Sequence, residues 1–167
     1  ITDPRLASIL GCTLMTKRSN AENTGAGANL DALVIEPYAN PFRVYPLVED
    51  YEKFKALFDK DVDCYIINTG DFLGKKVTKE VSLGVIETVV DGKANFELFG
   101  GLPGMEYLPV EGYEVPDMNG EYAELIRDRM QFRLDYLKAF NDANPEHQIP
   151  QDALESIKTI ERFIDVL

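Results

Sequence analysis

The spacing of the apolar residues most constrains the fold of this 167-residue chain. Four stretches place apolar side chains three or four residues apart, which is the repeat that gives a helix one apolar face. The predicted helices cover residues 47–60, 78–91, 119–140 and 150–165. An apolar face has to be buried against another element. We therefore expect helices around a shared core, the last two of which form a C-terminal helical pair.

Shorter signals predict the remaining elements. Asp3-Pro4 is typical of an N-cap followed by proline in the first turn, and it predicts a short helix to about residue 10 that Gly11 ends. The run at residues 63–68 is apolar and rich in strand-forming residues, so it predicts a buried strand. Further short strands are expected at residues 12–15, 30–35 and 96–99. Together these elements predict a single α/β domain over residues 1–167, with a small mixed sheet flanked by helices.

The charge and composition exclude several classes of partner. A net charge of −12 repels both nucleic acid and anionic membranes. Neither a long apolar run nor a signal-peptide pattern is visible, so we expect a cytoplasmic protein, and Ile1 in the first position indicates a piece of a longer one. Cys12 and Cys64 are expected to be reduced, buried thiols, and His147 lies in a polar loop, so these residues predict no metal site.

Residues 68–82 carry the features that point to a ligand. The expected strand ends in Asn68-Thr69-Gly70, a loop with Gly74 and two lysines follows, and Thr78 can cap the next helix. Glycines allow close approach of the backbone, lysines supply positive charge, and a helix start presents N–H groups. This order predicts an anion-binding crevice at a sheet edge. The glycine–lysine spacing of the triphosphatase phosphate loop is absent, so a plain connection with solvated lysines is the alternative.

The same residues carry a resemblance to a known family. Tyr65–Gly70, Gly74–Val77, Ser82 and Asp91-Gly92 resemble the C-terminal stretch of ATP-dependent phosphoenolpyruvate carboxykinase. The resemblance covers about residues 46–165. It implies part of a nucleotide-binding α/β domain, and an enzyme that converts oxaloacetate and ATP to phosphoenolpyruvate, carbon dioxide and ADP with Mg²⁺ or Mn²⁺.

The resemblance also implies roles for individual residues. It places this stretch at the adenine-side wall of the ATP site, where the implied nucleotide-binding residues are Asn68, Thr69, Gly70, Gly74, Lys75, Lys76, Val77 and Ser82. Lys76 takes the place of an arginine that lies against the base, Val77 that of an isoleucine beside the ring, and Ser82 that of a threonine able to hydrogen-bond. Arg18 takes the place of an arginine that touches phosphate and substrate, which makes it the catalytic candidate.

The departures from the family pattern leave more than one interpretation. Lys76 lacks the flat guanidinium of an arginine, and Asp71 stands where the family has tryptophan. The family's phosphate loop, metal ligands and N-terminal substrate arginines have no counterparts, so the chain alone is expected to be inactive, with the nucleotide and the remainder of the parent chain as partners. The alternatives are a non-catalytic nucleotide-binding or regulatory module derived from the same fold, and a purely structural interaction domain.

Overall fold

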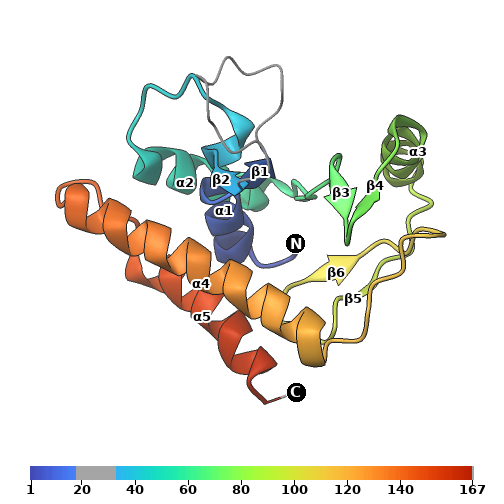
Figure 1. Ribbon diagram of the computed structural model, residues 1–167. Coiled ribbons are helices and arrows are strands. Elements are labelled where there is room, and N and C mark those ends of the chain that lie inside the picture. The colour runs from blue at the N-terminus through green and yellow to red at the C-terminus, as the bar shows by residue number, and fades with distance from the viewer. Residues whose placement is uncertain (18–32, 167) are drawn as a thin grey trace, which may run out of the picture.

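The computed structural model describes residues 1–17 and 33–166 (Figure 1). The chain forms the helices α1 (Pro4–Cys12), α2 (Leu47–Lys55), α3 (Lys79–Val90), α4 (Gly120–Ala143) and α5 (Gln151–Ile164). Two short 3-10 helices are η1 (Pro37–Ala39) and η2 (Phe58–Lys60). The strands are β1 (Met15–Lys17), β2 (Leu33–Ile35), β3 (Asp71–Phe72), β4 (Lys75–Lys76), β5 (Glu97–Leu98) and β6 (Glu106–Tyr107). No helix in this part of the chain is both long and apolar enough to cross a membrane.

The strands pair two by two. β1 pairs with β2, β3 with β4 and β5 with β6, each time antiparallel, with Met15 opposite Ile35 in the first pair. Helices combined with small sheets agree with the coarse prediction. The prediction of one mixed sheet is wrong for the described residues. Each strand has only two or three residues and pairs with a single neighbour, so no strand joins one pair to another.

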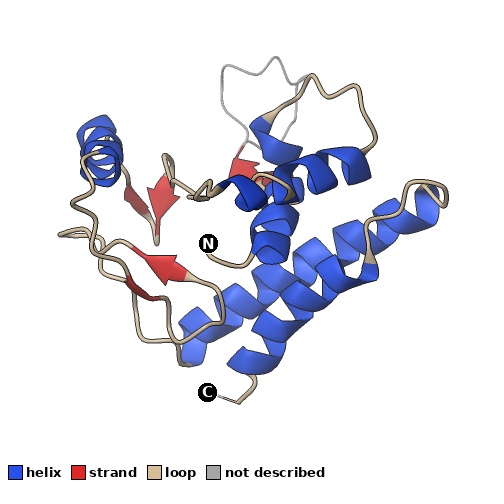
Figure 2. Ribbon diagram, turned by 180° about the vertical axis from the view of Figure 1, so that it is seen from behind, coloured by secondary structure: helices blue, strands red, loops and turns tan. Residues whose placement is uncertain are grey.

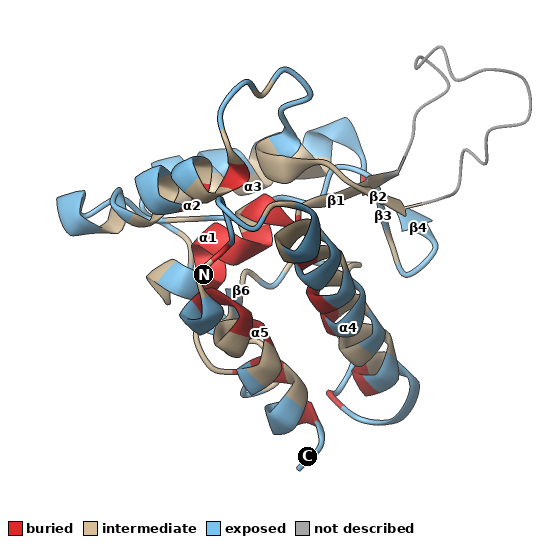
Figure 3. Ribbon diagram, turned by 90° about the vertical axis from the view of Figure 1, so that its left-hand side faces the viewer, coloured by how far each residue is buried: buried red, intermediate tan, exposed pale blue. Residues whose placement is uncertain are grey.

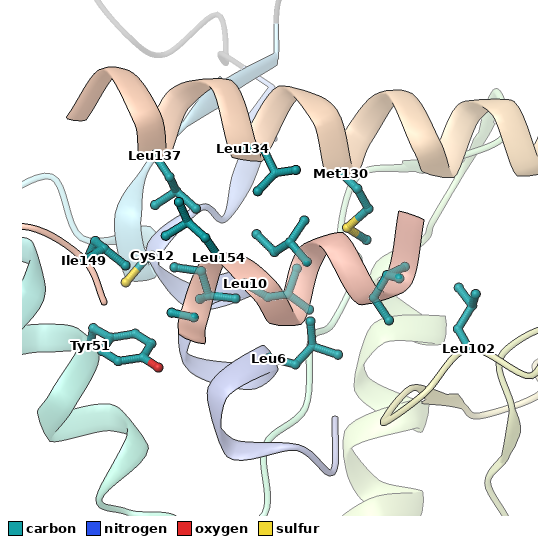
Figure 4. Packing of buried hydrophobic residues seen from close by; sticks show 14 of the residues in the cluster. Leu6, Leu10, Cys12, Tyr51, Leu102, Met130, Leu134, Leu137, Ile149 and Leu154 are labelled. Atoms are coloured by element: carbon teal, nitrogen blue, oxygen red, sulfur yellow. The ribbon is translucent and has the colours of Figure 1, made fainter. Parts of the chain in front are cut away.

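The core is helical and is built around α1. Buried side chains of α1, α2, α4 and α5 form one apolar cluster, and α1 contributes Leu6, Ile9, Leu10 and Cys12 to it. The buried positions follow the inner faces of these helices (Figure 3), and Figure 4 shows their side chains converging between α4 and α5. The predicted C-terminal helical pair is therefore confirmed, and its stripes are core.

The start of α1 agrees with the prediction, but its end does not. Asp3 caps the helix, with its Oδ1 accepting from the backbone N–H of Leu6 at 2.7 Å. Gly11 lies inside the helix, which continues to Cys12. A Cβ at Gly11 would lie 2.5 Å from the ring of Tyr38, so glycine serves close packing here and is not a helix terminator.

The α2 helix is shorter than predicted. It ends at Lys55, and η2 follows after a short break, with Asp61 in the left-handed region at φ 55°. The apolar spacing continues through both segments, which is why the sequence predicts one helix to residue 60. Spacing of three suits either helix type, so the change to a 3-10 turn is not visible in the pattern.

Three weak acids in or next to α1 are buried or partly buried, and they predict alkaline destabilisation. Cys12 Sγ lies 3.3 Å from Tyr38 Oη, which donates to the Ser8 carbonyl at 3.1 Å. Burial raises the pKa of Cys12 from 9.0 to about 12 and also raises the pKa of Tyr38 and Tyr51. Below pH 9.0 the Cys12 thiol is neutral in both the folded and the unfolded chain. Above it the unfolded thiol ionises first, so stability falls towards pH 12.

The expected result is a urea midpoint that declines steadily above about pH 9. Cys12→Ala removes one of the titrating groups, so its decline should be shallower than that of the unsubstituted chain. Equal slopes for the two chains would show that Cys12 is not neutral and buried in the folded state.

Candidate functional site

The α3 helix and the hairpins β3–β4 and β5–β6 lie on the same side of the molecule (Figure 2), and residues from these segments line a concave surface. We call it the apolar groove. It has a volume of about 1010 Å³, and its walls are residues 63–68, one face of α3, and the aromatic-rich chain around β5 and β6. The groove contains part of the predicted nucleotide site, so each described residue of that site can be placed relative to it.

The segment at residues 63–68 forms one wall, but it is not the buried strand that the sequence predicts. It is assigned to neither helix nor strand. Tyr65, Ile66 and Ile67 are 45%, 49% and 43% exposed. The apolar side chains of this run favour burial, but the prediction of a strand is wrong because no strand in the described part of the molecule pairs with it.

The Asn68-Thr69-Gly70 turn is held by its own hydrogen bonds. Asn68 Oδ1 accepts from the N–H of Gly70 at 2.9 Å, and its Nδ2 donates to the carbonyl of Asp71 at 3.0 Å. The Gly70 carbonyl accepts from the N–H of Val77 at 2.8 Å, which closes the β3–β4 hairpin. The Asn68 amide is thus engaged in shaping the turn.

Glycine at position 74 has a structural reason. Gly74 adopts φ +80° directly after Leu73, which adopts φ 48°, so the hairpin turn places two successive residues at positive φ. Glycine meets this demand without the strain that a side chain causes. The predicted ligand-binding glycine is therefore required by the turn itself.

The two lysines of β4 differ in their surroundings. Lys75 donates to the carbonyl of Gly112 at 2.5 Å, and its ammonium lies 4.5 Å from the centre of the Tyr113 ring. The Tyr113 hydroxyl donates in turn to the carbonyl of Lys76 at 2.7 Å. These contacts attach the hairpin to the loop after β6, whereas the Lys76 side chain is exposed without an ion pair in the described residues.

The start of α3 meets the prediction. The Thr78 hydroxyl caps the helix by accepting from the N–H of Val81 at 3.4 Å. One turn later, Ser82 Oγ donates to the carbonyl of Thr78 at 3.2 Å. Val77, which precedes the cap, is 8% exposed. A capped helix start therefore adjoins the groove, as the sequence pattern requires.

The structure divides the predicted site in two. Asn68, Val77 and Ser82 line the groove. The other described members lie outside its wall, on the turn and hairpin: Thr69, Gly70, Gly74, Lys75 and Lys76. Arg18, the catalytic candidate, lies outside the described residues.

Sequence reasoning missed the aromatic wall. Tyr65 stacks on Phe96 with ring centres 5.6 Å apart, and this contact joins the 63–68 segment to the chain before β5. Phe99, Tyr107 and Tyr122 also line the groove. The available signal was the density of aromatic residues between positions 96 and 122.

The electrostatics of the groove favour apolar over anionic groups. Among the described residues of its wall, the charged side chains are Asp63 and Glu106, both acidic. No lysine or arginine side chain of the described chain joins that wall. The groove can therefore receive an aromatic base or an apolar side chain, whereas a bare phosphate would meet two carboxylates.

The described residues contain no cluster of side chains that could hold a divalent metal without further ligands. Within positions 1–17 and 33–166, no three histidine, cysteine or acidic side chains gather into a group that could hold one. Comparison of the chain with protein-family models, curated proteins and solved structures finds no significant match.

Proposed function

We propose that residues 68–82 form the adenine-side wall of an ATP site in a longer, carboxykinase-like protein. That protein would convert oxaloacetate and ATP to phosphoenolpyruvate, carbon dioxide and ADP, and the present chain alone would be inactive. The observation that carries the proposal is the position of Val77 and Ser82 on a concave, mainly apolar wall. The sequence resemblance at these residues supports the same role.

The chemistry of this wall suits a purine base. Val77 and Val81 offer apolar surface to the face of a ring. Ser82 Oγ donates its proton to the Thr78 carbonyl, so its lone pairs remain to accept from an exocyclic amine such as that of adenine. These residues can therefore bind and recognise an adenine base.

When the base of ATP lies in the groove, its triphosphate has to extend out of the groove. Asp63 and Glu106 repel it, whereas the exposed Lys76 ammonium on β4 can approach it. Phosphoryl transfer depends on cationic clamps and on metal ions that neutralise the phosphate charge. We propose that the remainder of the parent chain provides these, and the residues described here account for binding of the base.

A non-catalytic nucleotide-binding or regulatory module is the second candidate. It is favoured by the acidic groove wall and by Lys76 in place of an arginine. The two candidates differ in chemistry, since the module has no carboxykinase activity. Carboxylation and decarboxylation assays on the longer protein distinguish them directly.

Calorimetry on the chain itself tests the division between base and phosphate contacts. ATP is expected to bind with a Kd of about 1 mM or weaker, because the phosphate clamps are missing. Adenosine is expected to bind about as well as ATP, because the groove contacts the base. Tight, metal-independent ATP binding would contradict the proposal, since it would require phosphate contacts within this chain.

Lys76→Glu in the longer protein tests the role of the hairpin. We expect its Kd for ATP to rise by about five- to tenfold, because a nearby charge is reversed. Lys60→Glu on η2 is the matched control: it makes the same change of charge at an exposed site outside the groove and should leave the Kd unaltered. An unchanged Kd for Lys76→Glu would remove this lysine from the site.

A further inference from the structure

The backbone at the centre of the 63–68 wall has no backbone partner among the described residues. In the described chain, the N–H and C=O groups of Tyr65, Ile66 and Ile67 form no hydrogen bond with other backbone groups. The one backbone contact nearby is the Cys64 carbonyl, which accepts from the amino group of Ile1 at 2.9 Å. A strand-forming, apolar run with free donors and acceptors is a template for another strand, and proteins rarely leave such an edge open.

The adjoining α3 helix is also incompletely covered. Half of its 12 residues are large apolar ones, and none of its side chains is fully buried. Val81, Val85 and Val89 line the groove, while Ile86 and Val90 line it and remain 41% and 78% exposed. An apolar helix face normally packs against another element. In the described chain, no segment covers the apolar surface that the 63–68 wall and α3 present to the groove.

The groove defines the chemistry of that neighbour. Its charged side chains in the described wall, Asp63 and Glu106, are both acidic and form no ion pair with a described residue, while the amino group of Ile1 donates to the Cys64 carbonyl. The whole chain carries a net charge of −12, so a second copy would meet mutual repulsion, whereas a basic partner would be attracted. Charge complementarity thus selects a partner with lysine or arginine.

We propose that the groove binds a polypeptide segment as an added β-strand. The segment pairs with the backbone of Tyr65–Ile67, places alternate apolar side chains against α3, and carries lysine or arginine at its ends to meet Asp63 and Glu106. This inference does not depend on nucleotide binding, because it uses the 63–68 backbone and the far turns of α3 rather than Val77 and Ser82.

A labelled probe peptide, Lys-Val-Thr-Val-Thr-Val-Lys, tests the proposal by fluorescence anisotropy. We expect saturable binding, and slower hydrogen exchange in the complex of the amides on the paired edge, which are either Ile66 alone or Tyr65 and Ile67 together, because successive N–H groups of a strand point to opposite sides. The same peptide with alternate amides N-methylated cannot pair along one edge, and it should bind about tenfold more weakly or not at all. Glutamate in place of the terminal lysines should weaken binding in the same direction.

Two variants of the chain complete the test. Ile66→Asp should abolish peptide binding without unfolding the chain, because Ile66 is 49% exposed. Phe42→Asp, at an 86% exposed position outside the groove, should bind as before. Equal binding of the N-methylated peptide, or slow exchange of the three amides in the free monomer, would overturn the proposal. Concentration-dependent dimerisation that protects these amides would also overturn it, in favour of a second copy as the occupant.

Discussion

Replacing Leu137 by alanine is expected to lower the free energy of unfolding by about 2–5 kcal/mol. Leu137 is 0% exposed and points from α4 into the cluster that α1 and α5 complete (Figure 4). Alanine loses the transfer free energy of the removed carbons and leaves a cavity among helices whose packing cannot fully close it. The measurement is urea denaturation followed by circular dichroism.

An exposed apolar residue supplies the control for this prediction. Val166→Ala, at a position that is 79% exposed, should change the free energy of unfolding by less than about 0.5 kcal/mol. Similar small losses for both variants would mean that the α1, α4 and α5 helices do not share a close-packed core. A large loss of unfolding free energy for Leu137→Ala, with little change for Val166→Ala, is the result expected from the core seen in the structure.

Gly11→Ala is expected to destabilise the chain by about 1–3 kcal/mol, although alanine is the better helix former. Gly11 lies within α1, and a Cβ there would lie 2.5 Å from Cε1 and 2.9 Å from Cδ1 of Tyr38. The Tyr38 ring has little freedom to move, because its hydroxyl contacts both Cys12 Sγ and the Ser8 carbonyl. The overlap must therefore be relieved by shifting η1 away from α1.

Gly84→Ala is the matched control. Gly84 also lies inside a helix, α3, but a Cβ there has no neighbour within 4 Å. The substitution should be neutral or stabilise by up to about 1 kcal/mol, as helix propensity predicts. If both variants gained stability, Tyr38 would not be packed against α1 in solution.

The helices could be predicted because their causes are local. The caps at Asp3 and Thr78 act within one turn, and the stripes of α4 and α5 repeat over many residues. The candidate site was predicted less completely. The turn after Asn68 and the start of α3 lie where the pattern places them. Two of the residues predicted to bind the ligand also have structural roles in the hairpin: the Asn68 amide holds the turn, and Gly74 adopts a positive φ.

Local pattern thus sufficed for the helical periods, the caps and the acidic charge, since each depends on neighbours within a few positions or on composition alone. The three-dimensional arrangement settled the rest. The apolar run at 63–68 lies exposed because no strand of the described chain reaches it, and Gly11 packs against a ring that is distant in sequence. The groove likewise joins α3 to aromatic residues from beyond position 96. Burial and strand pairing depend on which segments lie next to one another in the folded chain, and the spacing of residues along the sequence does not specify those long-range contacts.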